Sequence, residues 1–437
     1  MEKGNKKLIF AWAFYDWANS VYSLVITSAI FPLFYGALTI VKDEEGNVIS
    51  DRVDFLGMSF NNDALISYTT ALAFICIVIL SPLLSGIADF NGKKKSFMKF
   101  FNYLGVAGCI GLYWFNLEFL WLGLLFYLFG LIGFWGSIVF YNSYLPDIAN
   151  KDQQDQASAK GFALGYIGSV ILLIICLIMI LNYAAFGFES ESTPTRISFI
   201  LTGIWWLGFS QYTYFYLPYL EPKKNNSGSL IYSGYEEVKK VFLKIKDNPQ
   251  FYRYLIAFFV YSMAVQTIML VATYFGVKEI KWGETDATKG LITSILLIQL
   301  VAIVGAFLAA KLAKKYSNIW VLIGINIIWV LICFYAFLIE SPIQFYITAF
   351  FVGLVMGAIQ SLSRSTYSKM IPNKEKDTTS FFSFFDVTEK LGIIIGMLLY
   401  GSIAQITGNV RNAIIFLSLI FICGIILLMR VPKKNDI

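Results

Sequence analysis

The segment from Ser85 to Lys95 separates two long apolar runs and reads Ser-Gly-Ile-Ala-Asp-Phe-Asn-Gly-Lys-Lys-Lys. A carboxylate, Asp89, stands where the first run ends, and Gly92 permits a tight turn before the lysines. Asp89 is unfavourable at the C-terminal end of its own helix because the helix dipole is negative there. It is therefore expected to contact the N-terminus of another helix, and residues 378–380, Thr-Thr-Ser, offer one.

The composition of the 437-residue chain is typical of a membrane protein. Apolar residues make up 57% of the chain and charged residues 14%, whereas about a quarter of a soluble domain is charged. This excludes a soluble globular enzyme, and 34 Lys and Arg against 28 Asp and Glu is too small an excess to indicate a nucleic-acid partner. The sequence has no histidine, which removes Ser-His-Asp hydrolysis and His-ligated zinc or haem. No metal or cofactor is predicted.

Apolar stretches long enough to cross a bilayer recur along the chain. They predict an all-α membrane protein with twelve transmembrane helices in two six-helix bundles. The predicted spans are residues 8–38, 65–88, 97–115, 118–142, 160–183, 197–219, 251–276, 289–312, 318–339, 342–368, 380–406 and 411–430. Most Lys and Arg residues fall on the side of the N-terminus, so both termini are expected in the cytoplasm, at the plasma (inner) membrane if the protein is bacterial.

The longest polar break divides these spans six plus six. It predicts an N-terminal bundle of residues 1–220, a cytoplasmic connector of residues 221–250 and a C-terminal bundle of residues 251–437. The connector carries apolar residues at helical spacing, namely Val238, Val241, Phe242 and Ile245. With lysines opposite them, they suit an amphipathic helix on anionic headgroups, and a plain solvated connector is the alternative.

The two halves also share features at similar spacing. The matched pairs, 222 to 231 residues apart, are Lys93 with Lys315, Tyr141 with Tyr367, Gly161 with Gly392, and Gly165 with Gly396. Such agreement indicates a parallel duplication. The Gly-x-x-x-Gly pairs allow helices to approach closely, either for two bundles that rock or for static packing.

The first span carries a polar stripe in an otherwise aromatic helix. Asp16, Ser20, Ser23 and Thr27 follow helical spacing, and Asn19 lies beside them. Such a stripe is too polar to face lipid, and Asp16 lies deep enough that its ionisation is costly without a partner. The stripe is expected to line a substrate cavity, and a structural hydrogen bond between helices is the alternative.

The eleventh span holds three ionisable residues within one and a half turns: Asp386, Glu389 and Lys390. An i, i+4 ion pair between Asp386 and Lys390 would offset part of the cost of burial and leave Glu389 as the surplus carboxylate. This group is our candidate for ion coupling, with a structural network as the alternative.

The tenth span places Gln360 and Arg364 on one helix face. Arg364 is expected either to bind a substrate carboxylate or to extend to the inner interface. Gln266 and Thr267 in the seventh span and Gln299 in the eighth are further cavity candidates.

The segment from Ser85 to Lys95 resembles the cytoplasmic signature of the major facilitator superfamily, G-x-L-S/A-D-x-x-G-R/K-R/K. The resemblance implies that Asp89 latches the cytoplasmic side closed, with Gly92 forming the turn, whereas the plain alternative is a turn with a lysine run. Lys93 and Lys94 are expected to anchor this gating loop at the headgroups. The equivalent turn of the second half has Lys311 in place of the aspartate, so one latch is predicted.

Four short runs together resemble the vacuole-effluxer-like branch of the superfamily. They are Tyr15–Ser20, Gly161–Gly168, Val265–Thr267 and Gln360–Arg364. The resemblance implies amino-acid export from a vacuole in eukaryotic members and a permease role in bacterial ones. Two departures weaken a standard proton-coupling scheme: the fourth span has no Arg or Lys, and Ser262-Met263-Ala264 precedes Val265 where the branch often has an acidic residue and glycine.

These features predict a secondary active transporter that moves a small polar solute, such as an amino acid, by alternating access. Asp16 is expected to meet a substrate ammonium, and Arg364 or Lys390 a carboxylate. The expected partners are a small-molecule substrate, the lipid bilayer and a proton or other coupling ion, with the protein as a monomer. The alternatives are a non-transporting sensor or scaffold with the same fold, and a membrane-embedded transferase, which the lack of His and metal-ligand clusters disfavours.

Overall fold

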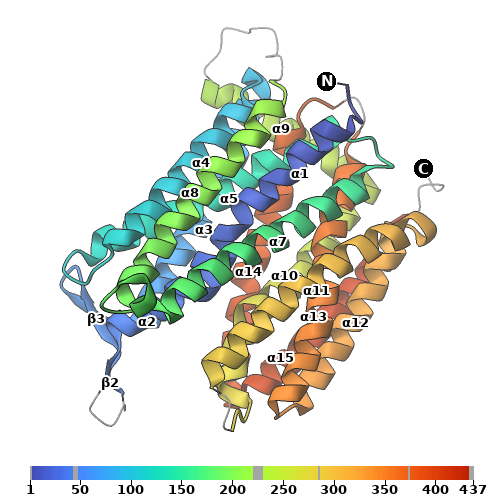
Figure 1. The fold of residues 1–437 in the computed structure, drawn as a ribbon. Coiled ribbons are helices and arrows are strands. Elements are labelled where there is room, and N and C mark those ends of the chain that lie inside the picture. Colours follow the sequence, from blue (N-terminus) through green and yellow to red (C-terminus); the bar gives the residue numbers. More distant parts are fainter. Residues whose placement is uncertain (1, 43–47, 220–229, 284–285, 373–374, 433–437) are drawn as a thin grey trace.

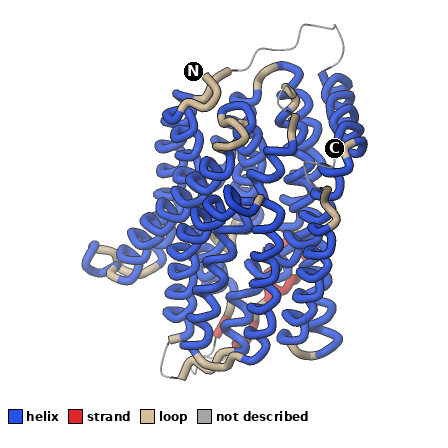
Figure 2. Tube along the Cα trace, turned by 90° about the vertical axis from the view of Figure 1, so that its right-hand side faces the viewer, coloured by secondary structure: helices blue, strands red, loops and turns tan. Residues whose placement is uncertain are grey.

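The computed structural model describes residues 2–42, 48–219, 230–283, 286–372 and 375–432. Residues 221–229 of the predicted connector lie outside this part of the chain. The described residues form an elongated helical protein with short strands at one end (Figures 1 and 2). We call the end that holds the N-terminus and helix α9 the terminus end, and the opposite end the strand end (Figure 1).

The first half of the molecule contains six long helical segments and four short strands. Its helices are α1 (Lys6–Val21), η1 (Tyr22–Ile30), α2 (Phe31–Thr39), α3 (Asn62–Asn91), α4 (Lys94–Gly111), η2 (Leu112–Trp114), α5 (Leu120–Ser143), α6 (Leu145–Ile148), α7 (Gln154–Leu181), η3 (Tyr183–Phe186) and α8 (Ser192–Tyr216). Its strands form two antiparallel hairpins, β1 (Val41–Lys42) with β2 (Val48–Ser50), and β3 (Arg52–Phe55) with β4 (Met58–Asn61).

The second half contains six further long helices. They are α10 (Pro249–Glu279), α11 (Ala287–Tyr316), α12 (Asn318–Leu338), α13 (Pro342–Met370), α14 (Thr378–Thr407) and α15 (Val410–Met429). Their starts follow from local sequence, because proline fits the first turn of a helix and short polar side chains cap it. Ser341, for example, caps α13 in a capping box with Gln344.

The first predicted span is one continuous helical rod that changes type in its middle. The regular helix α1 passes into the π-helix η1 and then into α2. The predicted span 8–38 is therefore helical, with π-type in place of α-type backbone pairing over Tyr22–Ile30.

The two halves repeat the same helix pairings. In the first half α1 packs on α7 and α8, α4 on α5 and α8, and α3 on α5. In the second half α10 packs on α14 and α15, α12 on α13 and α15, and α11 on α13. Two contacts between the halves also correspond to each other. Helix α7 of the first half contacts α11 of the second, and its counterpart α14 contacts α3, the counterpart of α11. This repeated packing agrees with the parallel duplication expected from the sequence. The domain limits at residues 220 and 250 stay a prediction.

Nine helical stretches of the described residues are long and apolar enough to cross a membrane. Helices α4, α8 and α14 are not among them, although they pack within the same bundles. All twelve predicted spans coincide with long helices, whereas the number of membrane crossings stays a prediction.

Helix α9 (Leu230–Asp247) follows the described end of the first half and differs from the expected arrangement. It packs on α3 and contacts α10 and α14. Val241 and Ile245, predicted to face headgroups, are fully buried against the protein. The apolar face was misassigned because the amphipathic pattern does not say whether protein or lipid covers it.

Candidate functional site

A cavity of about 420 Å³ lies between the two halves. Its walls come from α1, η1, α3, α5 and α7 on one side and from α10, α11, α13 and α14 on the other. All seven residues predicted to bind substrate lie on its wall: Asp16, Asn19, Ser20, Ser23, Gln266, Gln360 and Arg364. A volume of a few hundred Å³ suits a small solute.

Two amide atoms on this wall have no hydrogen-bond partner among the described residues. They are Asn19 Nδ2, from α1, and Gln299 Oε1, from α11. Because buried polar groups are normally paired, a donor and an acceptor are left for a bound solute or for water. Thr267, another cavity candidate, instead donates to the Met263 carbonyl at 2.7 Å and is buried outside the wall.

Asp16 and Arg364 form an ion pair across the two halves. Asp16 Oδ2 lies 3.2 Å from both Nη1 and Nη2 of Arg364 and accepts from the Tyr141 hydroxyl at 2.8 Å. Arg364 also donates to Ser158 Oγ and to the Ser158 carbonyl, each at 2.9 Å, and to Asn142 Oδ1 at 3.2 Å. The expectation that Arg364 extends to the inner interface was wrong, because it is 3% exposed.

This pair changes the roles assigned to the two residues. Separate contacts of Asp16 with an ammonium and of Arg364 with a carboxylate were expected, yet in this structure each is the partner of the other. The guanidinium carbon also lies 5.0 Å from the Trp12 ring and 4.2 Å from the Phe162 ring. Aromatic faces attract the cation, so the second half inserts one arginine into an aromatic and acidic pocket of the first.

Gly161 provides the space for the Asp16–Arg364 pair. A Cβ at this position would lie 2.5 Å from Asp16 Oδ2 and 2.8 Å from Arg364 Nη2. At Gly165, a Cβ would lie 2.4 Å from Ser20 Oγ. The Gly-x-x-x-Gly pair of α7 therefore lets α1 approach and also makes room for the buried ion pair.

The second charged group lies on α14. Lys390 Nζ is 3.1 Å from Asp386 Oδ1 and 2.8 Å from Glu389 Oε2, so the predicted pair of Asp386 with Lys390 is confirmed. The assignment of Glu389 as a surplus carboxylate was wrong, because it pairs with Lys390 and accepts from Gln266 Nε2 at 2.8 Å. Asp386 Oδ2 is instead the buried carboxylate oxygen that lacks a hydrogen-bond partner among the described residues.

This α14 group reaches the cavity and the opposite half. Glu389 lines the cavity, whereas Asp386 and Lys390 lie behind the wall. Lys390 Nζ lies 3.5 Å from the centroid of the Trp135 ring of α5, a cation–π contact across the two halves.

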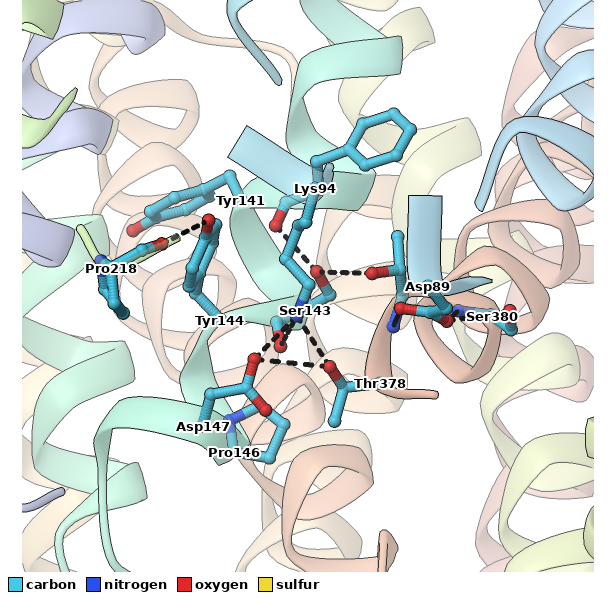
Figure 3. A network of polar contacts seen from close by, with 12 residues as sticks. Asp89, Lys94, Tyr141, Ser143, Tyr144, Pro146, Asp147, Pro218, Thr378 and Ser380 are labelled. Carbon is cyan, nitrogen blue, oxygen red and sulfur yellow. Dashed lines mark hydrogen bonds and ion pairs between the residues drawn. The ribbon is translucent and has the colours of Figure 1, made fainter. Parts of the chain in front are cut away.

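Towards the terminus end, polar contacts join the two halves (Figure 3). Asp89 accepts from the backbone N–H of Thr379 at 3.2 Å and from the N–H and hydroxyl of Ser380 at 2.7 and 2.8 Å. The contact predicted for Asp89 with the N-terminus of another helix is thereby confirmed, since α14 begins at Thr378. Its role as a gate stays a prediction.

Lys94 occupies a different place from the one predicted. It is fully buried, pairs with Asp147 at 2.6 Å and donates to Thr378 Oγ1 at 2.6 Å and to the Ser143 carbonyl at 3.2 Å (Figure 3). The prediction that Lys94 anchors the loop at the headgroups was therefore wrong, because the turn directs the Lys94 side chain into the protein. Gly92 has a φ of +65°, as the tight turn requires, and Lys93 is exposed.

Three further contacts join the halves. Asp155 of α7 pairs with Lys369 of α13 and accepts from Asn318 Nδ2 at 2.8 Å. Tyr166 donates to Gln360 Oε1 at 2.9 Å. Together with the Asp89 and Lys94 contacts, they tie α3, α4 and α7 to α13 and α14.

Several residues of these networks were missed in the sequence. They are Tyr141, Asn142, Asp147, Asp155 and Ser158, all near the end of α5 or the start of α7. The sequence pattern that could have predicted them is a run of polar residues after an apolar span. The same pattern is typical of an ordinary loop. Among the residues that the structure describes, no group of three His, Cys, Asp or Glu side chains is placed to hold a metal ion.

Two similar six-helix halves in parallel arrangement around a central cavity are the architecture of the membrane transporters called the major facilitator superfamily. The model of the family described as "Vacuole effluxer Atg22 like" matches residues 4–436, and the chain belongs to this family. It is a multi-pass integral membrane protein with the fold of this transporter superfamily.

Individual relatives agree with this assignment. The chain is 33% identical over 429 residues to the uncharacterized MFS-type transporter YxiO of Bacillus subtilis (strain 168), covering 98% of this chain and 95% of that protein. It is 23% identical over 475 residues to Autophagy-related protein 22 of Eremothecium gossypii, covering 95% and 89%. Among solved structures, the MFS transporter FucP in the outward conformation matches with a TM-score of 0.69 at 12% identity, covering 98% and 99%. At that identity the match shows the fold alone.

Proposed function

We propose that this protein is a secondary transporter that carries a small polar solute through the central cavity by alternating access. The observation that carries the proposal is a cavity with polar and charged residues on its wall, placed between two similar halves that polar contacts join towards the terminus end. In alternating access, such halves rock about a site near the middle of the membrane. Breaking the terminus-end contacts would open the cavity on that side.

The proposed orientation follows from the distribution of positive charge. Lysines gather at the terminus end, so this end faces the cytoplasm under the positive-inside rule. The structure then corresponds to a state closed towards the cytoplasm, with Asp89, Gly92, Lys93 and Lys94 in the gating turn. The N-terminal bundle of residues 1–220 and the C-terminal bundle of residues 251–437 are the two moving parts.

A zwitterion such as an amino acid fits the chemistry of the cavity. It carries one ammonium and one carboxylate, the same two charges that Asp16 and Arg364 present to each other. It can therefore exchange with this pair, with its ammonium on Asp16 and its carboxylate on Arg364, without leaving a buried charge unpaired. Asn19 Nδ2 supplies a donor and Gln299 Oε1 an acceptor from opposite halves, each without a partner among the described residues.

Ion coupling is assigned to the α14 group. When all its members are ionised, the group has one carboxylate more than its single cation, so it has room for one bound proton. Glu389 is the member on the cavity wall and is the coupling residue of this scheme, and Asp386 and Lys390 set its charge. The protein is taken to act as a monomer without a cofactor or catalytic residue.

Solute uptake into sealed liposomes tests this function. A labelled amino-acid mixture should accumulate in vesicles that contain the wild-type protein and exchange in a counterflow assay. Asp16→Asn should abolish counterflow, whereas Asp54→Asn, a change in strand β3 remote from the cavity, should not. Counterflow by Asp16→Asn at the wild-type rate removes Asp16 from the site, and no counterflow of any solute by the folded wild-type protein favours a sensor or scaffold.

A pH gradient across the vesicle membrane tests the coupling. Uptake by the wild type should rise when the gradient is imposed, and Glu389→Gln should retain exchange but lose this response. A Glu389→Gln protein that is still driven by the gradient would move the coupling away from Glu389.

A further inference from the structure

Helix α9 is held firmly against the bundle by its inner face. Its backbone at Gly234 lies so close to α3 that a Cβ on Gly86 would come within 2.3 Å of the Gly234 carbonyl oxygen. Val241 and Ile245, further along α9, are buried in the hydrophobic core that contains Phe251 and Tyr254 of α10. Lys244 pairs with Glu375 at 2.6 Å, just before α14. These contacts fix which side of α9 remains uncovered.

The outer face of α9 combines aromatic residues and lysines. At 100° per residue, six exposed side chains project within an arc of about 100°. They are Tyr232, Tyr235, Lys239, Phe242, Leu243 and Lys246. The four apolar or aromatic members are 46–60% exposed. The acidic residues of this helix, Glu236, Glu237 and Asp247, fall outside the arc.

The position of α9 indicates that lipid covers this face. Leu72, Ile79 and Gly86 of α3 are seven residues apart and therefore share one side of that helix. Leu72 is 49% exposed and Ile79 is 66% exposed, as expected of side chains in contact with lipid tails. Helix α9 begins where this apolar line reaches Gly86, near the terminus end (Figure 1). It thus lies at the depth where acyl chains give way to headgroups.

We propose that this outer face of α9 binds anionic phospholipid headgroups. Tyrosine and phenylalanine rings suit the interface between tails and headgroups, and lysines extend from it to negative phosphates. Lys239 and Lys246 lie seven residues apart on the face, two helical turns, so both can contact the same leaflet surface. A binding surface for a soluble protein is the competing outcome.

The experiment is a lipid titration of the purified full-length protein in detergent, followed by thermal unfolding. Phosphatidylglycerol should raise the unfolding midpoint in a saturable way, and neutral phosphatidylcholine at equal concentration should not. Lys239→Gln/Lys246→Gln should raise the half-saturating phosphatidylglycerol concentration about 30-fold, because two lysines near an anionic surface contribute about 1 kcal/mol each and about 1.4 kcal/mol corresponds to tenfold. Glycerol phosphate in place of lipid separates free phosphate from a headgroup held in a membrane and should give no shift.

The matched control is Lys314→Gln/Lys315→Gln, which removes two exposed lysines at the terminus end of α11. This variant should keep the wild-type titration curve. Equal curves for the wild type and both double variants, or an equal response to phosphatidylcholine, would overturn the proposal. The test measures lipid binding and is independent of whether the protein transports a solute.

A spin label on the outer face gives a second measurement. In bilayers, a nitroxide at Tyr235→Cys, in a Cys423→Ser background, should be more accessible to dissolved oxygen than one at Lys314→Cys and less accessible to a water-soluble nickel complex. Equal accessibility of both labels to nickel would place the face in water and contradict lipid contact.

Discussion

The two buried charge groups of the cavity differ in balance and in what they join. The Asp16–Arg364 pair has one charge of each sign, links α1 to α13, and gives the guanidinium acceptors on Asp16, Asn142 and Ser158. The α14 group has two carboxylates around Lys390 within one helix, and Asp386 Oδ2 has no partner in the part of the chain that the structure describes. The first group is balanced in charge, and the second is not.

This difference indicates different tasks for the two groups. Removing one partner from a complete buried pair leaves an uncompensated charge, so such a pair strongly favours the state that contains it. A group with an extra carboxylate can instead gain or lose a proton at smaller cost. We therefore expect the first group to control the rocking of the halves and the second to respond to ions.

The largest effect should follow from removing the arginine. Arg364→Ala leaves Asp16 buried without its cation and should lower the free energy of unfolding by about 3–5 kcal/mol. Arg364→Lys keeps the charge but loses the planar fork that contacts several acceptors at once. It should fold and show little counterflow. Unfolding midpoints and counterflow rates give both results, and a fully active Arg364→Lys would show that charge alone is sufficient.

A methyl group at Gly161 should disturb the same pair without altering any charge. In Gly161→Ala the new Cβ would clash with Asp16 Oδ2 and Arg364 Nη2, and overpacking of this kind costs about 1–3 kcal/mol. Gly208→Ala is the matched control, because a Cβ there meets nothing within 4 Å. The midpoint should fall for Gly161→Ala and stay constant or rise for Gly208→Ala. Equal midpoints for the two variants would mean that the pair can move aside.

Much of the fold could be predicted from the sequence, because it depends on local pattern. Apolar run lengths located the long helices, and the helix dipole argument located the partner of Asp89 across the chain. The Asp386–Lys390 pair was also accessible, since residues four apart share a helix face. These features need only spacing along one helix or a general rule about helix ends.

The rest depends on tertiary placement. Asp16 and Arg364 are 348 residues apart, and their pairing depends on the close approach that Gly161 allows. Lys94 turned inward because Asp147 of the short helix α6 lies within reach as its ion-pair partner, which no local pattern shows. The π-helix within the first span depends on shifted backbone pairing rather than on composition.

Neutralising Asp386 should have a smaller effect than either change at the pair. Asp386→Asn removes a charge that has one unpaired oxygen, and Lys390 keeps Glu389 as its partner. We expect the free energy of unfolding to change by no more than about 1 kcal/mol, since losing the ion pair and relieving the repulsion between carboxylates oppose each other. Thermal unfolding of both single variants sharpens the contrast with Arg364→Ala. A loss as large as that of Arg364→Ala would mean that the α14 group is as complete as the pair.

The smallest effect should come from the ring that Lys390 faces. Trp135→Phe keeps an aromatic surface but weakens the cation–π contact, which is worth about 0.5–2 kcal/mol when desolvated. Trp135→Leu removes it entirely, so midpoints should fall in the order Trp, Phe, Leu. Side-chain size alone gives the same order, so each pair of variants is repeated in the Lys390→Met background, where no cation faces the ring. The steps should shrink there if the contact is electrostatic. If the differences in unfolding midpoint are as large in the Lys390→Met background as in the wild type, Trp135 contributes by packing alone. Of these two contacts, Asp16–Arg364 would then be the one in which charge joins the halves at the cavity.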